Sequence, residues 1–163
     1  GDFVVRAGSI ISDGNPSAGS VSIESGHSGT GQSGDVTIQS GDQESGERSG
    51  ALDFKSGSTS TSRSGDVKLS SGDSGESTTG DIQIAAGAGQ SGSSGSIHIS
   101  GGSNAGGAGG QLSLTSGVGL ESGAVTVVSA DSVQSGTVSV GSGTATIDNS
   151  GDLSLLSGEA GHA

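Results

Sequence analysis

Large aliphatic residues stand in two regular columns along the chain, separated by single polar residues and framed by glycines. One eight-residue motif, reading glycine, small or acidic, aliphatic, polar, aliphatic, any residue, small, glycine, occurs eleven times between Gly1 and Gly158, and Ala130 replaces its closing glycine once. The opening glycines recur at intervals of 13 to 18 residues, most often 15. This alternation of apolar and polar positions predicts one short strand with one buried face in each repeat.

The two aliphatic columns stand two and four residues after each opening glycine, and they hold 22 of the 31 Val, Ile, Leu and Phe residues. Because residues two apart on a strand share a face, we expect these side chains to point inward and to stack from repeat to repeat. The predicted core ladder consists of Val21, Ile23, Val36, Ile38, Leu52, Phe54, Val67, Leu69, Ile82, Ile84, Ile97, Ile99, Leu112, Leu114, Val125, Val127, Val138 and Val140.

The column between the aliphatics is mostly polar, which predicts that it faces solvent. Asp53 and Lys68 stand in this column, and burying either charge without a partner would be costly. In a stack of parallel strands about 4.8 Å apart, these two residues would lie on adjacent rungs.

The segments between motifs consist mainly of Ser, Gly, Thr, Asn, Gln and acidic residues, without helical periodicity. A repeat of about 15 residues is too short for a helix, a strand and two turns, so the chain is predicted to be all-β. We expect a single-stack parallel β-solenoid, or β-helix, of about eleven coils that covers residues 1–163 as one array. Residues 1–18, which include the only proline, are expected to form an irregular first coil or cap, and residues 110–150 contain shorter coils.

The composition alone favours a different interpretation, intrinsic disorder. The chain has 35 glycines, no cysteine, methionine, tryptophan or tyrosine, and a formal net charge of −12. Few large apolar residues combined with high net charge are typical of disordered segments, but the sorting of the aliphatic residues into columns argues for order. The five Lys and Arg residues cannot form the basic stripe that phosphates require, so no nucleic-acid partner is expected. No apolar run approaches the ~20 residues of a membrane span.

Recurring Gly-Asp pairs offer the best candidates for a metal site. Asp66 and Asp81 would lie in one column of a stack and are weak candidates for Ca²⁺ ligands; an aspartate that accepts a turn N–H is the alternative. His27, His98 and His162 show no zinc-binding or catalytic spacing. Because no nucleophile elbow or phosphate loop is found either, we predict a non-enzymatic protein without a cofactor.

The motif Gly-x-Val-x-Ile-x-Ser-Gly, as in Gly34–Gly41, resembles that of Gly/Ser-rich short-coil β-solenoid repeat proteins of secreted or cell-surface type, and it covers nearly all of the chain. This resemblance implies a structural or adhesive role in an extracellular fibre, surface appendage or coat, located outside the cell or at its surface. An alternative is an ice-binding (antifreeze) β-solenoid, to which the chain is similar in coil length and glycine content. The threonine ladder of that family is missing, because Thr144-Ala145-Thr146 is the only Thr-x-Thr run.

A second alternative is a polysaccharide-binding or carbohydrate-active β-helix, which needs longer coils and a cluster of carboxylates in a cleft. Partners are predicted from the ends of the array, which show no cap and would expose unpaired strand edges. We expect self-association, or contact with neighbouring coils of a larger protein, through the ends or a lateral face. The two alternatives would make an ice or carbohydrate surface the partner instead.

Overall fold

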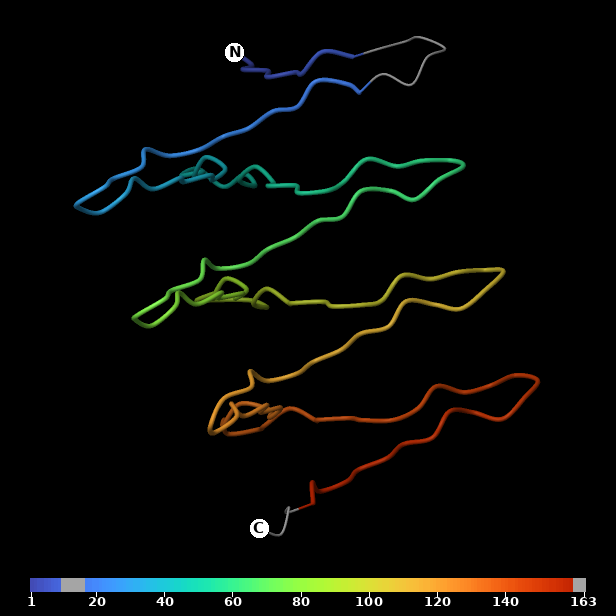
Figure 1. Ribbon diagram of the computed structural model, residues 1–163. Coiled ribbons are helices and arrows are strands. Elements are labelled where there is room, and N and C mark those ends of the chain that lie inside the picture. The colour runs from blue at the N-terminus through green and yellow to red at the C-terminus, as the bar shows by residue number, and fades with distance from the viewer. Residues whose placement is uncertain (10–16, 160–163) are drawn as a thin grey trace. The chain divides into compact units, whose positions relative to one another are not determined.

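The aliphatic columns do not form strands in the structure. The structure, a computed structural model, describes residues 1–9 and 17–159. Over these ranges the chain forms no helix and no strand, and Figure 1 draws it as a plain tube without coiled ribbons or arrows. None of the described residues is buried, and few contacts join residues distant in sequence. The chain is an extended coil.

The accessible surface gives a measure of this extension. The chain exposes 16369 Å² for a mass of 15.2 kDa. A compact monomer of that mass would expose about 7,100 Å², and its unfolded chain about 22,000 Å². The single chain therefore leaves more than twice the surface of a compact fold in contact with solvent.

The predicted single-stack parallel β-solenoid, or β-helix, is wrong for this chain. A solenoid needs a ladder of backbone hydrogen bonds along every motif, whereas the described residues form only five backbone–backbone hydrogen bonds. Each of the five joins the closing glycine of one motif to the opening glycine of the next, outside the aliphatic positions. Because the motif backbones pair with nothing, neither rungs nor an enclosed interior form.

The chain divides into two units, Gly1–Gln83 and Ile84–Ala163. The sequence predicts one continuous array, and the boundary between the units falls inside the motif that runs from Gly80 to Gly87. Of the irregular segment predicted at 1–18, residues 10–16 lie outside the described residues. The shorter repeats predicted at 110–150 lie in the second unit.

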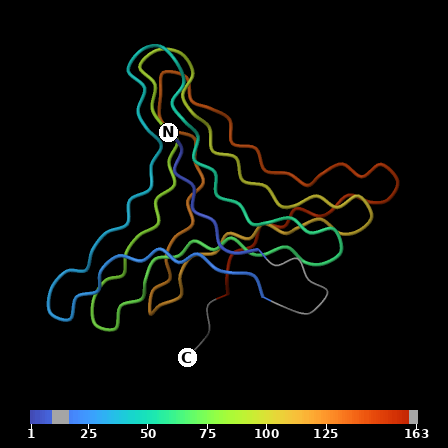
Figure 2. The same ribbon diagram turned by 90° about the horizontal axis from the view of Figure 1, so that it is seen from above.

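Between successive motifs lie the segments that we call connectors, each running from a closing glycine to the next opening glycine. Figure 2 shows the chain folding back on itself at these connectors. Each bend covers three residues. The bends in the described residues are at 29–31, 45–47, 60–62, 75–77, 90–92, 105–107, 119–121, 132–134 and 146–148.

Short polar side chains explain why the connectors bend where they do. In four connectors, the residue just before the bend accepts a hydrogen bond from a backbone N–H two or three residues later, an arrangement that competes with regular structure. The donors and acceptors are Gly31 N–H to Ser28 Oγ at 2.9 Å, Ser62 N–H to Thr59 Oγ1 at 3.3 Å, Ser77 N–H to Ser74 Oγ at 3.0 Å, and Gly106 N–H to Asn104 Oδ1 at 3.0 Å. Two other bends contain a glycine with positive φ, Gly46 at 76° and Gly92 at 89°, where a side chain would be strained.

Five connectors are closed at their base by one backbone hydrogen bond. In each, the N–H of the opening glycine donates to the carbonyl of the preceding closing glycine. This bond brings together the two arms of the connector, which are the residues on either side of its bend. These bonds are Gly19 to Gly8 at 3.0 Å, Gly34 to Gly26 at 3.0 Å, Gly95 to Gly87 at 3.3 Å, Gly110 to Gly102 at 2.8 Å, and Gly123 to Gly117 at 3.1 Å.

The residue before each closing glycine is always Ser, Ala or Gly, and the closed connectors explain this restriction. A Cβ added at Gly34 would lie 3.4 Å from the Cβ of Ser25, and one added at Gly95 would lie 3.2 Å from the Cβ of Ala86. A larger residue before the closing glycine would hold the arms apart. The sequence pattern suggests that the closing glycine is the crowded one, but the structure places the close approach at the opening glycine.

Gly101 tests this explanation, because neither arm of its connector carries a Cβ at the contact. A Cβ at Gly101 would overlap the carbonyl oxygen of Gly110. In Gly101→Ala we expect the arms to separate toward the spacing of the Ala86 connector, where the bond between the glycines is 3.3 Å rather than 2.8 Å. The amide proton of Gly110 should then show a steeper temperature dependence of its NMR shift. Gly72→Ala is the matched control, since nothing lies within 4 Å of a Cβ there; an equal response in both variants would contradict the explanation.

Candidate functional site

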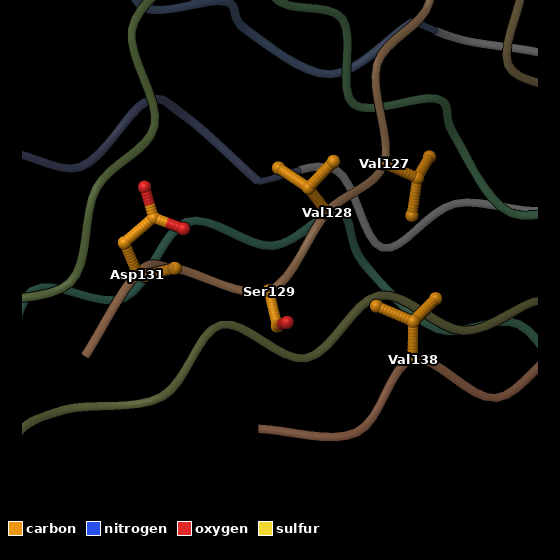
Figure 3. Close-up of a pocket in the computed structure, with 6 residues that line it drawn as sticks. Val127, Val128, Ser129, Asp131 and Val138 are labelled. Carbon is orange, nitrogen blue, oxygen red and sulfur yellow. The ribbon is translucent and has the colours of Figure 1, made fainter. Parts of the chain in front are cut away.

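Close approach at the base of a connector places aliphatic residues of successive motifs around one hollow, also in connectors without a backbone hydrogen bond. In the second unit, a Cβ at Gly136 would lie 3.9 Å from the Cβ of Ser129. Val127 stands two residues before Ser129, and Val138 stands two residues after Gly136. Both line one surface hollow with Val128, Ser129, Ala130 and Asp131. Figure 3 shows Val138 on a different run of chain from Val127, Val128, Ser129 and Asp131, and the bend at 132–134 lies between the two runs in sequence.

The first unit repeats this arrangement. A Cβ at Gly65 would lie 3.8 Å from the Cβ of Ser56. Two residues outward stand Phe54 and Val67, which line a second hollow together with Lys68 and Leu69. Each hollow is therefore lined by the second aliphatic column of one motif and the first column of the next.

We call two aliphatic residues placed in this way a cross-arm pair. The same count assigns one pair to each of the eight connectors, from the second motif onward, whose opening glycine approaches the small residue of the preceding motif. These pairs are Ile23 with Val36, Ile38 with Leu52, Phe54 with Val67, Leu69 with Ile82, Ile84 with Ile97, Ile99 with Leu112, Leu114 with Val125, and Val127 with Val138.

The cross-arm pairs remain open to solvent. The residues of the predicted core ladder are 48–75% exposed, so the single chain contains no buried ladder. In every motif from Gly19 onward the first-column residue is less exposed than the second, as with Val138 at 48% and Val140 at 66%. The residues of each pair are thus partly shielded from solvent, and about half or more of their surface stays exposed.

Three bends of the second unit carry a different kind of apolar residue. Leu120, Val133 and Ile147 stand at the middle of the last three bends and are 94–110% exposed. The six earlier bends have no large aliphatic residue. These three side chains stand in the bends rather than in the two aliphatic columns, which distinguishes them from the cross-arm pairs.

The predicted calcium candidates are not brought into a metal site. The carboxylate of Asp66 contacts two cations, Arg63 Nη2 at 2.7 Å and Lys68 Nζ at 3.8 Å. No group of three or more potential metal ligands, including Asp81, occurs within residues 1–9 and 17–159. Lys68, which was expected on the rung next to Asp53, forms its ion pair with Asp66 in its own motif.

Neither hollow has the form of a small-molecule site. The hollow beside Val127 has a volume of about 590 Å³ and the one beside Phe54 about 350 Å³, which is within the range of ligand pockets. A ligand pocket, however, encloses its ligand and presents convergent polar groups. Here the lining residues are themselves exposed, apart from the half-buried Ser129, and each hollow offers one charged side chain, Asp131 or Lys68.

Two further sequence features lie apart from these hollows. His27 and His98 are exposed, while His162 lies outside the described residues. Among the described residues, no helix is long and apolar enough to cross a membrane.

Comparisons with known proteins give no relative for this chain. No protein-family model matches it, and neither the curated proteins nor the solved structures contain a match. The interpretation of the site therefore rests on the chain itself.

The cross-arm pairs were not apparent from the periodicity, which suggested contacts between equivalent residues of successive repeats. A signal for them exists in the sequence. The invariably small residue before each closing glycine indicates a close approach to the following opening glycine, and this approach sets the register from which the pairs follow.

Proposed function

We propose that this chain is a non-enzymatic structural repeat protein of an extracellular fibre, surface appendage or coat, and that it works by associating with further protein chains. The observation that carries the proposal is the series of exposed cross-arm pairs. Eight such pairs leave apolar surface uncovered in both units, and exposed apolar surface on this scale marks sites of association.

The chemistry of the remaining surface supports the same role. Serine, glycine and acidic residues dominate the connectors, so these segments stay hydrated while the aliphatic pairs associate. The absence of cysteine from the sequence leaves backbone and apolar contacts as the means of assembly. An extracellular or cell-surface location is part of the proposal, supported by the resemblance of the motif to secreted repeat proteins.

Sedimentation velocity from micromolar to millimolar protein tests this function. We expect the weight-average sedimentation coefficient to rise with concentration, and electron microscopy of the concentrated sample to show elongated assemblies. A single species of unchanged sedimentation coefficient over the whole range would overturn the proposal. Antibodies against the chain should label extracellular or surface material of the source cells, and labelling confined to the cell interior would contradict the location.

A further inference from the structure

We infer that the bend containing Leu120 in one copy of this chain docks into the hollow beside Phe54 in another copy. Leu120 enters the apolar hollow, and the carboxylate of Glu121 meets the ammonium group of Lys68. The inference rests on the proposed function and names what covers one cross-arm pair, Phe54 with Val67. The exposure and shape of the bend, the lining of the hollow and the distribution of charge each support it.

The bend at 119–121 carries fully hydrated apolar side chains. Leu120 is 110% exposed, the highest value among the large apolar residues that the structure describes, and Val118 just before the bend is 100% exposed. The free energy gained by covering apolar surface rises with the area removed from water. This bend therefore gains more from docking than the half-exposed residues of the cross-arm pairs.

The same bend is held in one shape by its connector. The N–H of Gly123 donates to the carbonyl of Gly117 at 3.1 Å, and these residues are only six positions apart, which makes this the shortest of the five closures. A Cβ at Gly119 would lie 2.9 Å from the carbonyl oxygen of Glu121, so the turn is tight. A segment shaped in advance loses less conformational freedom on binding.

This shape distinguishes Leu120 from the other two aliphatic residues that stand in bends, Val133 and Ile147. In the described residues, the connectors that carry Val133 and Ile147 have no hydrogen bond between their closing and opening residues. Docking either of those bends would require ordering a more open connector. The Leu120 bend is therefore the one best prepared to enter a hollow.

The hollow in the first unit suits an aliphatic side chain with a neighbouring acid. Phe54, Val67 and Leu69 line it together with a single charged residue, Lys68. Its volume is about 350 Å³, roughly that of a dozen liquid waters, which accommodates a branched aliphatic side chain. Lys68 Nζ lies 3.8 Å from the Asp66 carboxylate in an exposed ion pair, and exposed pairs of this kind are weak, so Lys68 remains available to a second carboxylate.

The distribution of charge identifies a second copy as the occupant. All five Lys and Arg residues lie in the first unit, and four of them stand between residues 48 and 69 with only two acids. The second unit has five acids and no Lys or Arg. Each copy thus carries the hollow in a positive stretch and the Leu120 bend in an anionic unit, and opposite charges steer such surfaces together. The hollow beside Val127 contains Asp131, which would repel Glu121.

The contact joins two different surfaces, so it is heterologous. One copy can offer its bend to a second copy while its own hollow receives the bend of a third, and contacts of this type build rings or extended assemblies. Burial of Leu120 supplies most of the affinity, and the pair between Glu121 and Lys68 sets the orientation.

Carbodiimide cross-linking tests the contact, because this reagent joins a lysine amine to a carboxylate that it touches. Isotopically labelled and unlabelled chains are mixed in equal amounts at about 0.15 M salt, and the products are identified by mass spectrometry. We expect a Lys68–Glu121 product that contains one labelled and one unlabelled chain. The ion pair of Lys68 with Asp66 within one chain provides an internal standard for the reaction.

Two sets of variants show whether this product reports docking. Leu120→Ser should lower the yield of the Lys68–Glu121 product about tenfold, which is the lower end of the effect of burying one leucine. Val133→Ser is the matched control and should leave the yield unchanged. Lys68→Glu and Glu121→Lys should each lose the product alone, and mixing these two variants should restore a product between positions 68 and 121.

The other outcomes separate this contact from the proposed function. A Lys68–Glu121 product found only within single chains, or an equal loss of yield in Leu120→Ser and Val133→Ser, would overturn the docking. The same holds for association in sedimentation velocity without any product between these positions. In each of these cases the proposed function stands as long as the chains associate. Absence of association at every concentration would overturn both.

Discussion

Replacing Ile38 by aspartate is expected to weaken association about a hundredfold and to leave the dimensions of the single chain unchanged. Ile38 is already 53% exposed in the single chain, so the monomer has little burial to lose. Full burial of an isoleucine contributes about 1.5–3 kcal/mol, and covering the exposed half in each of two copies amounts to about 1.5–3 kcal/mol, which reaches roughly a hundredfold in the dissociation constant at its upper end. Sedimentation equilibrium measures the association, and dynamic light scattering of the dilute protein measures the monomer.

Thr37→Asp is the matched control, because it adds the same charge at the neighbouring position in the polar column. We expect it to change the dissociation constant far less than Ile38→Asp. Equal weakening by the two variants would show that charge alone governs association. An increase in the hydrodynamic radius of the monomer in Ile38→Asp alone would show that Ile38 supports an interior of the single chain, contrary to its exposure.

Association is also expected to strengthen, by roughly tenfold or more, when the ionic strength is raised from about 0.01 M to about 0.15 M, because the Debye length shortens from about 30 Å to about 8 Å. The physical reason is the net charge of −12 on every copy, whose mutual repulsion opposes assembly at low salt. Sedimentation equilibrium at a series of NaCl concentrations gives the dependence.

Two controls accompany the salt series. Sucrose at matched osmolality should not reproduce the whole effect, since it does not screen charge. The double variant Asp35→Asn and Asp81→Asn, which removes two negative charges from exposed positions, should associate more tightly at low salt and respond less to NaCl. Weaker association at high salt would instead indicate that ion pairs between copies, rather than apolar contacts, drive assembly.

The repeat and the position of its turns could be predicted from the sequence, because both depend on local chemistry. Ser28 and Thr59 precede bends and accept hydrogen bonds from N–H groups three residues later, an interaction that needs only a short hydroxyl side chain and the adjacent backbone. Glycine spacing likewise marks the ends of the connectors. Such features do not depend on tertiary contacts with the rest of the chain.

The β-solenoid could not be predicted correctly, because alternation at period two does not specify what covers the apolar face. Val36 and Ile38 have the pattern of a half-buried strand, and the periodicity led to the expectation of a parallel neighbour from the same chain. The structure instead brings Ser40, two residues after Ile38, close to the opening glycine Gly50 of the next motif, across a connector that reverses the chain. One such contact covers too little area to exclude water from either residue.

The prediction of calcium ligands rests on a related assumption. Asp66 and Asp81 occupy equivalent positions of the repeat, and equivalence becomes proximity only if repeats stack in register. Without that stack, the nearest charged groups to Asp66 are those close in sequence, Arg63 and Lys68. Sequence reasoning was thus limited at each site by the assumption that equivalent residues are neighbours.

The five closed connectors also bear on how the chain responds to force or denaturant. Each closure joins residues only six to eleven positions apart, so forming or breaking one involves a short loop whose entropy cost changes slowly with length. Closures of this kind open independently of one another and re-form rapidly. A single chain would therefore lengthen in many small, reversible steps and act as an extensible tether, whereas a brittle element would yield in one transition.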